Sequence, residues 1–223
     1  MRVRPIVLLS AIAVALSLGC NDPTKGKTAA TVGSAVAIPD AAASGAGAAP
    51  AAGNVTYKVS PEGSKIGFVG SKITGKHEGT FGKFEGTIDV VGGKAETGRV
   101  TITIDPSTLK TEDEELDDHL KSKDFFDVKK FPKASFVSTS IAPIAPAGAG
   151  GATHTVTGNL ELHGVTRSIG VPATIAIADG EVTANAEFTI KRKDFGIVYP
   201  GKPDDLIKDE VLIKLSLKAP KKT

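Results

Sequence analysis

The feature that most constrains the fold of this chain is a strict alternation of apolar and polar residues. It recurs in five segments, which are residues 100–104, 155–162, 171–177, 182–190 and 211–217. Successive side chains of a β-strand point to opposite faces, so each segment predicts a strand with one apolar face and one face toward water. Strands of this kind are typical of antiparallel sheets, because parallel sheets are usually covered on both faces.

Turn-forming residues separate the alternating segments. Glycine-containing pairs stand at 92–93, 163–164 and 179–180, and the last of these is an Asp-Gly hairpin signal. We therefore predict eight or nine strands with short connections, in an all-β domain over residues 54–223. Such a domain is a sandwich or a closed barrel. Closure removes exposed strand edges, but the periodicity alone does not choose between the two architectures.

One segment departs from the alternation and predicts a short helix. Residues 111–123 carry acidic side chains early and lysines late, an order that complements the helix dipole. Leu116 and Leu120 stand four residues apart, so they lie on the same side of a helix and would face the sheet. We expect this helix near the mouth of a barrel.

The N-terminus has the pattern of a secretory signal peptide over residues 1–19, with Arg2 and Arg4 before an apolar run. The run from residue 6 to 18 is shorter than the ~20 residues that span a bilayer. Residues 17–20 resemble a bacterial lipobox, which predicts cleavage before Cys20 and its acylation. The alternative is an ordinary signal peptide with an incidental cysteine, which leaves the protein secreted to the periplasm.

Acylation of Cys20 predicts a protein on the periplasmic side of the cell envelope, held to the membrane by its lipid anchor, in a leaflet that the sequence leaves open. Residues 20–53 are predicted to be a flexible linker. Their last thirteen residues contain eight alanines, three glycines and one proline, which offer too little large apolar surface to offset the entropy of ordering. Such a tether would let the domain stand away from the membrane.

Charge and motif content argue against several classes of function. The 27 basic and 25 acidic residues leave a nearly neutral chain, which predicts no nucleic-acid partner. The four histidines form no HExxH motif, and the carboxylates of residues 112–118 do not follow an EF-hand pattern. No metal is predicted, although a site assembled from distant strands stays open. No GxSxG motif is present and the single thiol is assigned to the lipid anchor, so we predict neither catalytic residues nor an enzyme.

Three blocks of sequence carry a resemblance to a known family. They are HLKSKDFFDVKKFPKASFVSTSI (119–141), GNLELHGVTRSI (158–169) and FTIKRKDFGI (188–197). In content, order and spacing these blocks resemble the YceI-like polyisoprenoid-binding proteins, and the likeness runs from about Tyr57 to Leu217.

The resemblance implies an antiparallel eight-stranded lipocalin-like barrel with an elongated apolar cavity and no established catalysis. It implies that the protein binds, sequesters or transports a long-chain polyisoprenoid or quinone-type lipid in the cell envelope, without any other cofactor. One alternative is an envelope stress or interaction protein whose barrel is filled by side chains. Another is an enzyme acting on such lipids, which requires acid and base groups inside the cavity. Pairing of two barrels into a homodimer is left open.

Alternation and size select the candidate ligand-binding residues, each with ordinary core packing as the alternative. The wall candidates are Ile66, Phe68, Phe81, Phe84, Ile88, Ile102, Phe136, Leu160, Leu162, Ile175 and Phe188. The candidates that close one end are Leu116, Leu120, Phe125 and Phe126. Arg192, between Lys191 and Lys193, is predicted to meet an anionic head group, or else to pair with Asp194 or another carboxylate.

Overall fold

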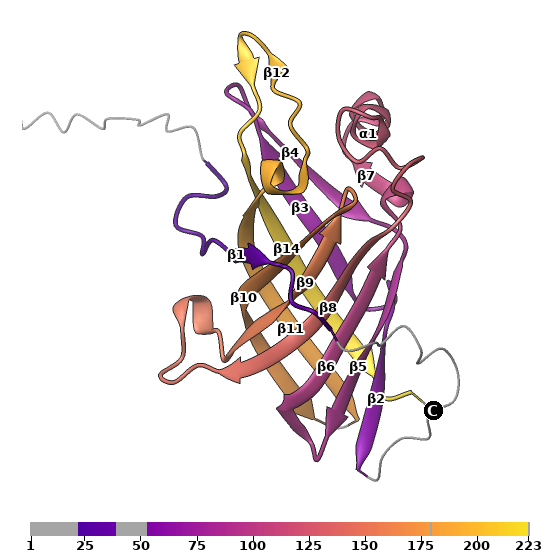
Figure 1. Ribbon diagram of the computed structural model, residues 1–223, viewed down its shortest axis with the longest axis vertical. Coiled ribbons are helices and arrows are strands. Elements are labelled where there is room, and N and C mark those ends of the chain that lie inside the picture. The colour runs from indigo at the N-terminus through magenta and orange to yellow at the C-terminus, as the bar shows by residue number, and fades with distance from the viewer. Residues whose placement is uncertain (1–21, 39–52, 179, 223) are drawn as a thin grey trace, which may run out of the picture.

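The computed structural model describes residues 22–38, 53–178 and 180–222, most of which belong to one strongly curled antiparallel sheet (Figure 1). The predicted signal peptide and Cys20 lie outside these ranges. The strands are β1 (Thr31–Ser34), β2 (Asn54–Val59), β3 (Lys65–Ser71), β4 (Lys76–Phe81), β5 (Phe84–Val91), β6 (Lys94–Ile104), β7 (Leu109–Thr111), β8 (Ala134–Pro143), β9 (His154–Leu162), β10 (Val165–Ala178), β11 (Glu181–Lys191), β12 (Gly201–Lys202), β13 (Asp205–Leu206) and β14 (Glu210–Pro220). The helices are α1 (Glu114–Lys121) and the 3₁₀ turns η1 (Pro106–Thr108), η2 (Ala149–Gly151) and η3 (Arg192–Phe195).

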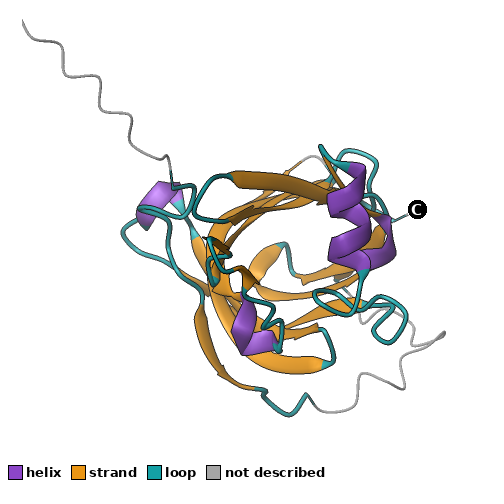
Figure 2. Ribbon diagram, turned by 90° about the horizontal axis from the view of Figure 1, so that it is seen from above, coloured by secondary structure: helices purple, strands orange, loops and turns teal. Residues whose placement is uncertain are grey.

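Within the described residues, the strands of the large sheet follow the order β2-β5-β6-β8-β9-β10-β11-β14-β3-β4-β7, with β1 beside β10. The sheet curls until β2 meets the end of β14, where Tyr57 bridges Lys221 and the Lys222 amide donates to the Thr56 carbonyl at 2.8 Å. Seen from above, the strands surround an interior space (Figure 2). The predicted all-β, lipocalin-like barrel with one short helix is confirmed. The strand count is higher than predicted, because short strands such as β7, β12 and β13 accompany the long ones.

One cluster of buried side chains packs inside the barrel and includes Tyr57, Val59, Val90, Val182 and Ala219. Figure 1 shows β2, which carries the first two of these residues, at the end away from α1. These side chains come from β2, β5, β11 and β14, whose alternation turns them to the same interior face. The polar residues that border the cavity, such as Lys72, His77 and Lys202, lie in the elements at the end that carries α1, so the cavity opens toward solvent there (Figure 1).

The predicted helix forms over Glu114–Lys121, shorter than expected because Thr111 pairs with β4 as part of β7. The Asp113 carboxylate caps it, accepting from the amides of Glu115 at 2.9 Å and Leu116 at 3.3 Å. No helix in the described parts of the chain is long and apolar enough to cross a bilayer.

Buried Asp117 ties α1 to β7. Its carboxylate accepts one hydrogen bond from the Thr111 amide at 2.6 Å and another from the Thr111 hydroxyl at 2.8 Å. Burial acts to raise the pKa of Asp117, but the hydrogen bonds from Thr111 and Lys110 outweigh it and hold that pKa below its ordinary value. The helix is therefore fixed to the sheet at the open end of the barrel.

Residues 22–38, here called the N-terminal arm, correct the prediction of a flexible linker. Thr31–Ser34 pair with Gly170–Arg167 of β10, and Ala29 bridges Thr189 of β11. β10 pairs with β11 only from Thr174 onward, so the arm occupies the gap between the two strands. Exposed strand edges present unpaired backbone groups, and the backbone of a segment of small residues can form hydrogen bonds with them. The prediction from composition alone was therefore wrong for residues 22–38. Residues 39–52 lie outside the described ranges.

Candidate functional site

A cavity of about 420 Å³ occupies the interior of the barrel. This volume falls within the roughly 300–1,000 Å³ of typical ligand sites. Its wall is built from every second residue of the long strands, including Val211, Ile213, Leu215 and Leu217 of β14 and Ala184, Ala186, Phe188 and Ile190 of β11. The alternation read from the sequence therefore places one continuous apolar surface around the cavity.

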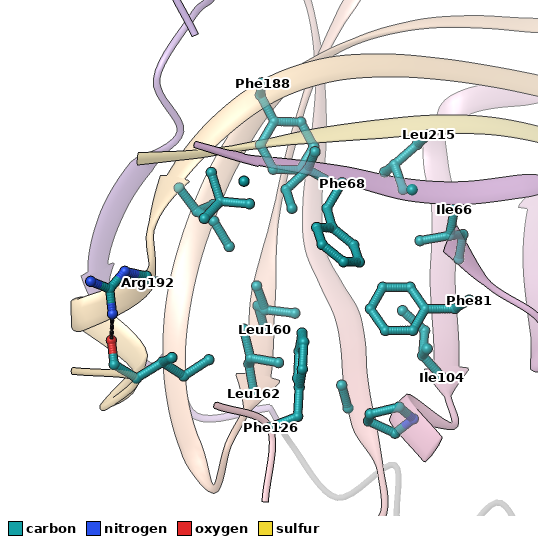
Figure 3. Close-up of a pocket in the computed structure, with 18 of the residues that line it drawn as sticks. Ile66, Phe68, Phe81, Ile104, Phe126, Leu160, Leu162, Phe188, Arg192 and Leu215 are labelled. Atoms are coloured by element: carbon teal, nitrogen blue, oxygen red, sulfur yellow. Dashed lines mark hydrogen bonds between the residues drawn. The ribbon is translucent and has the colours of Figure 1, made fainter. Parts of the chain in front are cut away.

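Most of the predicted ligand-binding residues line this cavity, and several are seen pointing into the same space in Figure 3. Those on its wall are Ile66, Phe68, Phe81, Ile88, Ile102, Phe136, Leu160, Leu162, Ile175 and Phe188. Those contributed by α1 and the segment after it are Leu116, Leu120, Phe125 and Phe126. Their contact with a ligand stays a prediction, but the structure brings them together around one cavity.

Phe84 does not line the cavity. Its side chain is buried in the packed cluster with Tyr57 and Val59. It has the same parity in β5 as Ile88, which does reach the cavity. Parity thus identifies the face of the strand, but it does not show which residues on that face are covered by their neighbours.

Three phenylalanines from separate elements meet at one side of the cavity (Figure 3). The ring centroids of Phe68 and Phe81 are 5.7 Å apart, and Phe126 lies 6.4 Å and 5.9 Å from them. Gly79 on β4 makes room for this arrangement, because a Cβ atom there would stand 2.3 Å from the Phe68 ring. The position of the Phe68 ring therefore depends on a glycine in the neighbouring strand.

A second aromatic group, formed by His119, Phe125 and Tyr199, lies where α1 approaches the loop after η3. Its ring centroids are 5.0 to 5.4 Å apart, and all three side chains border the cavity. His119 also contacts the Asp124 carboxylate at 3.2 Å. Aromatic side chains from elements that are distant in the sequence thus meet at the border of the cavity.

Arg192 borders the cavity, and its guanidinium group makes hydrogen bonds to the backbone. It is 4% exposed and donates to the backbone carbonyls of Lys208 at 3.0 Å, Ile197 at 2.8 Å and Ile207 at 3.3 Å. Figure 3 marks one of these hydrogen bonds. Burial lowers its pKa, and the nearby Asp209 carboxylate acts in the opposite direction. Arg192 thus joins two loops beside the cavity, and among the described residues it forms no ion pair with Asp194. Its contact with an anionic head group stays a prediction.

The flanking Lys191 and Lys193 are exposed and do not line the cavity. Other polar residues that sequence reasoning missed do border it, among them Ser71, Lys72, His77, Lys202 and Asp205. They belong to strand ends and loops, where no periodicity marks them. The Ser71 hydroxyl is buried without a hydrogen-bond partner, and Lys72 pairs with Asp205 at 2.8 Å.

The polar groups near the mouth are mostly engaged with one another. His77 Nδ1 lies 2.6 Å from a Glu112 carboxylate oxygen. Hydrogen bonds, first from backbone and then from His77, hold the pKa of Glu112 below its ordinary value. Across residues 22–38, 53–178 and 180–222, no three His, Cys, Asp or Glu side chains come together as a metal site.

Comparison with known proteins places this geometry in a family. The sequence model of the YceI-like domain matches residues 57–219. A UPF0312 protein of Pseudomonas savastanoi pv. phaseolicola is 37% identical over 132 residues, which cover 55% of this chain and 65% of that protein. The chain thus spans slightly less than two thirds of this relative. A UPF0312 protein of Pseudomonas fluorescens is 35% identical over 158 residues, covering 65% and 78% of the two chains.

Solved structures share the fold. The crystal structure of Burkholderia cenocepacia BcnA is 33% identical, with a TM-score of 0.62 over 72% of this chain and 99% of that one. A polyisoprenoid binding domain from Saccharophagus degradans, implicated in plant cell wall breakdown, has a TM-score of 0.59 over 75% and 99% of the chains. At 17% identity, that likeness concerns the fold alone. From the match across residues 57–219, we conclude that this chain belongs to the YceI-like family.

Proposed function

We propose that the protein binds a long-chain polyisoprenoid or a quinone-type lipid in the cavity of its barrel. The observation that carries this proposal is a continuous apolar cavity with polar residues gathered at its mouth. Burying apolar surface contributes roughly 25 cal/mol per Å², so an extended hydrocarbon chain gains free energy along the whole wall. An amphiphile would lie with its chain inside and its head group near Lys72, His77 and Lys202.

The cavity favours this function over that of an interaction protein with a filled barrel. Protein interiors are close-packed, and voids larger than a water molecule are few. An interior of about 420 Å³ lined by leucine, isoleucine, valine and phenylalanine is therefore better explained as a ligand site than as a packing defect.

No catalytic step is part of the proposal. The ionisable side chains at the mouth form pairs, as Lys72 does with Asp205 and His119 with Asp124. Groups engaged in this way are suited to fixing loops at the mouth, and the wall itself is hydrocarbon. Binding and release of a lipid need nothing more.

We also infer a place for the protein in the cell envelope. The pattern of residues 1–20 supports export and acylation of Cys20, which would hold the barrel on the periplasmic side of a membrane. A lipid carrier in that position has its ligand in the adjacent bilayer. Sequestration and transport then differ only in where the ligand is released.

Uptake by the delipidated protein tests the proposed function. The full chain, stripped of lipid with organic solvent and refolded, should take up a polyprenyl phosphate or a long-chain ubiquinone in an equimolar ratio. Leu160→Asp places a charge on the cavity wall, so this variant should lose uptake. Glu161→Gln changes the next residue, which is exposed, and should bind like the parent protein. Failure of the parent protein to bind either lipid would contradict the proposal.

A further inference from the structure

The N-terminal arm begins beside the mouth of the cavity. The Asp22 carboxylate accepts a hydrogen bond from Lys208 Nζ at 2.7 Å, and the Lys208 amide donates to the Ser71 carbonyl at 2.8 Å. Ser71 and Ile207, which precedes Lys208, both line the cavity. The hydrogen bonds from Lys208 and Thr24 lower the pKa of Asp22 to about 2. The first described residue is thus fixed to the loops at the mouth.

Chain length then limits where a membrane anchor can lie. Each residue of an extended chain spans at most about 3.6 Å, so an anchor two residues before Asp22 is limited to about 7 Å from it. An acyl chain on Cys20 would therefore enter the bilayer close to the mouth. A free linker would let the barrel tumble away from the membrane, whereas the docked arm holds the mouth end near it.

The loops at the mouth also carry exposed apolar side chains. Three of the six large hydrophobic residues exposed in the described parts of the chain are Ile73 (59%), Val198 (63%) and Leu206 (47%), which we call the mouth surface. The Ile73 amide donates to the Leu206 carbonyl at 3.2 Å, so two of these residues are neighbours. The β12–β13 hairpin that carries Leu206 projects beyond the barrel at this end (Figure 1).

The mouth surface is continuous with the entrance to the cavity. Lys72 precedes Ile73, Tyr199 follows Val198, and all of Lys72, Tyr199 and Ile207 line the cavity. At the opposite end, the β5–β6 hairpin exposes Val91, which is 42% accessible. The remaining two, Val32 and Val36, lie on the arm, so among the loops at the two ends the described apolar exposure is greater where the cavity opens.

We propose that the mouth surface docks on a lipid bilayer, so that the cavity opens toward the membrane. The proposal rests on the proposed lipid ligand and on acylation of Cys20. A long isoprenoid chain dissolves poorly in water, and docking lets it pass between bilayer and cavity without exposure. Lys72 is paired with Asp205, and Asp204 follows Lys202 by two positions in the sequence, so the positive charges here are accompanied by negative ones and the contact should depend little on salt.

Tryptophan probes test this orientation directly, because the chain contains no tryptophan. Ile73→Trp and Leu206→Trp report on the mouth surface, and Val91→Trp is the matched control at the far end. Each full chain, purified from a bacterial envelope, is reconstituted into vesicles of phosphatidylethanolamine and phosphatidylglycerol, with and without brominated acyl chains. Bromine should quench tryptophan at positions 73 and 206 several-fold more than at 91, in low and high salt alike.

Several results would overturn the docking proposal. These are equal quenching at all three positions, stronger quenching at position 91, or no association with vesicles. Tryptophans at 73 and 206 that are shielded from a water-soluble quencher but not reached by bromine would mean that a protein covers the surface instead.

Lipid extraction from the same samples separates this proposal from the proposed function. If isoprenoid is bound but bromine does not quench tryptophan at positions 73 and 206, only the docking proposal is contradicted. If bromine quenches tryptophan at these positions but no lipid is bound, the proposed lipid-binding function is contradicted. As a kinetic check, the double variant Ile73→Ser/Leu206→Ser should take a polyprenyl lipid from donor vesicles about tenfold more slowly than Val91→Ser. Equal transfer rates would contradict the docking proposal.

Discussion

At the scale of single residues, the cavity depends on side chains that do not touch a ligand. Arg192 uses three backbone carbonyls to join the η3 loop to the segment before β14. Gly79 leaves the space into which the Phe68 ring fits. Both residues determine the shape of the mouth or wall through their neighbours.

Arg192→Lys should destabilise the protein. A lysine carries one ammonium group and cannot reproduce the planar arrangement of guanidinium donors, so buried carbonyls lose their partners. We expect the free energy of unfolding to fall by about 2 kcal/mol in urea denaturation, with Lys193→Arg on the exposed neighbour as a neutral control. Unchanged stability with loss of bound lipid would instead support the head-group role that the sequence suggested.

Gly79→Ala should reduce the space for ligand. The added methyl group would stand 2.3 Å from the Phe68 ring, which must move toward the cavity or strain the sheet. Such overpacking costs about 1–3 kcal/mol, and the bound lipid should shift to shorter chains. Gly75→Ala is the control, since no atom lies within 4 Å of its added carbon. Equal lipid content in the two variants would show that Phe68 does not limit the cavity.

At the scale of elements, the sequence predicts what is periodic and misses what is short or paired over distance. Alternation identifies β6, β9, β10, β11 and β14. Of these, β11 and β14 pair over eleven residues, and the alternation alone is enough to predict both strands. The helix is predictable because acidic residues begin it and two leucines share a side. β1, β7, β12 and β13 have two to four residues each, too few for a periodicity to appear.

The same reasoning accounts for the candidate site. Parity places the wall residues, since facing the interior is a local property of a strand. The mouth is built from loops that meet only after the barrel forms, so Ser71, Lys202 and Asp205 carry no local signal. The docking of the N-terminal arm depends on a gap between β10 and β11 that no local pattern reveals.

The arm should be held in place partly by the Asp22–Lys208 pair. The folded pKa of Asp22, about 2, lies below its ordinary value of 3.8, so the pair stabilises the docked arm above pH 3.8 and loses this effect as the pH falls toward 2. An exposed pair contributes at most about 1 kcal/mol, which corresponds to about fivefold in opening.

Hydrogen exchange measures this opening. At neutral pH, Asp22→Asn should raise exchange in residues 28–34 up to about fivefold and leave β14 unchanged. The difference between the two proteins should shrink as the pH approaches 2. Identical exchange of the arm in both proteins at neutral pH would mean that strand pairing with β10 alone holds it.

At the scale of the whole molecule, the barrel combines packed clusters of side chains with an interior cavity. The cluster around Tyr57 and Val59 supplies a folding core that does not need a ligand. A ligand that binds only the folded state stabilises it by mass action, so removing lipid should lower the melting temperature. Calorimetry of the protein before and after extraction checks this, and equal melting temperatures would contradict a tightly bound ligand.

Native mass spectrometry of the full chain, purified from a bacterial envelope without added lipid, tests whether the barrel carries a lipid. We expect a mass excess that organic extraction identifies as one isoprenoid or quinone-type lipid per barrel, and that Leu160→Asp lacks. The same spectrum reports whether barrels pair. A parent protein that is empty as purified, and whose mass matches that of Leu160→Asp apart from the substitution, would contradict lipid binding in the cavity.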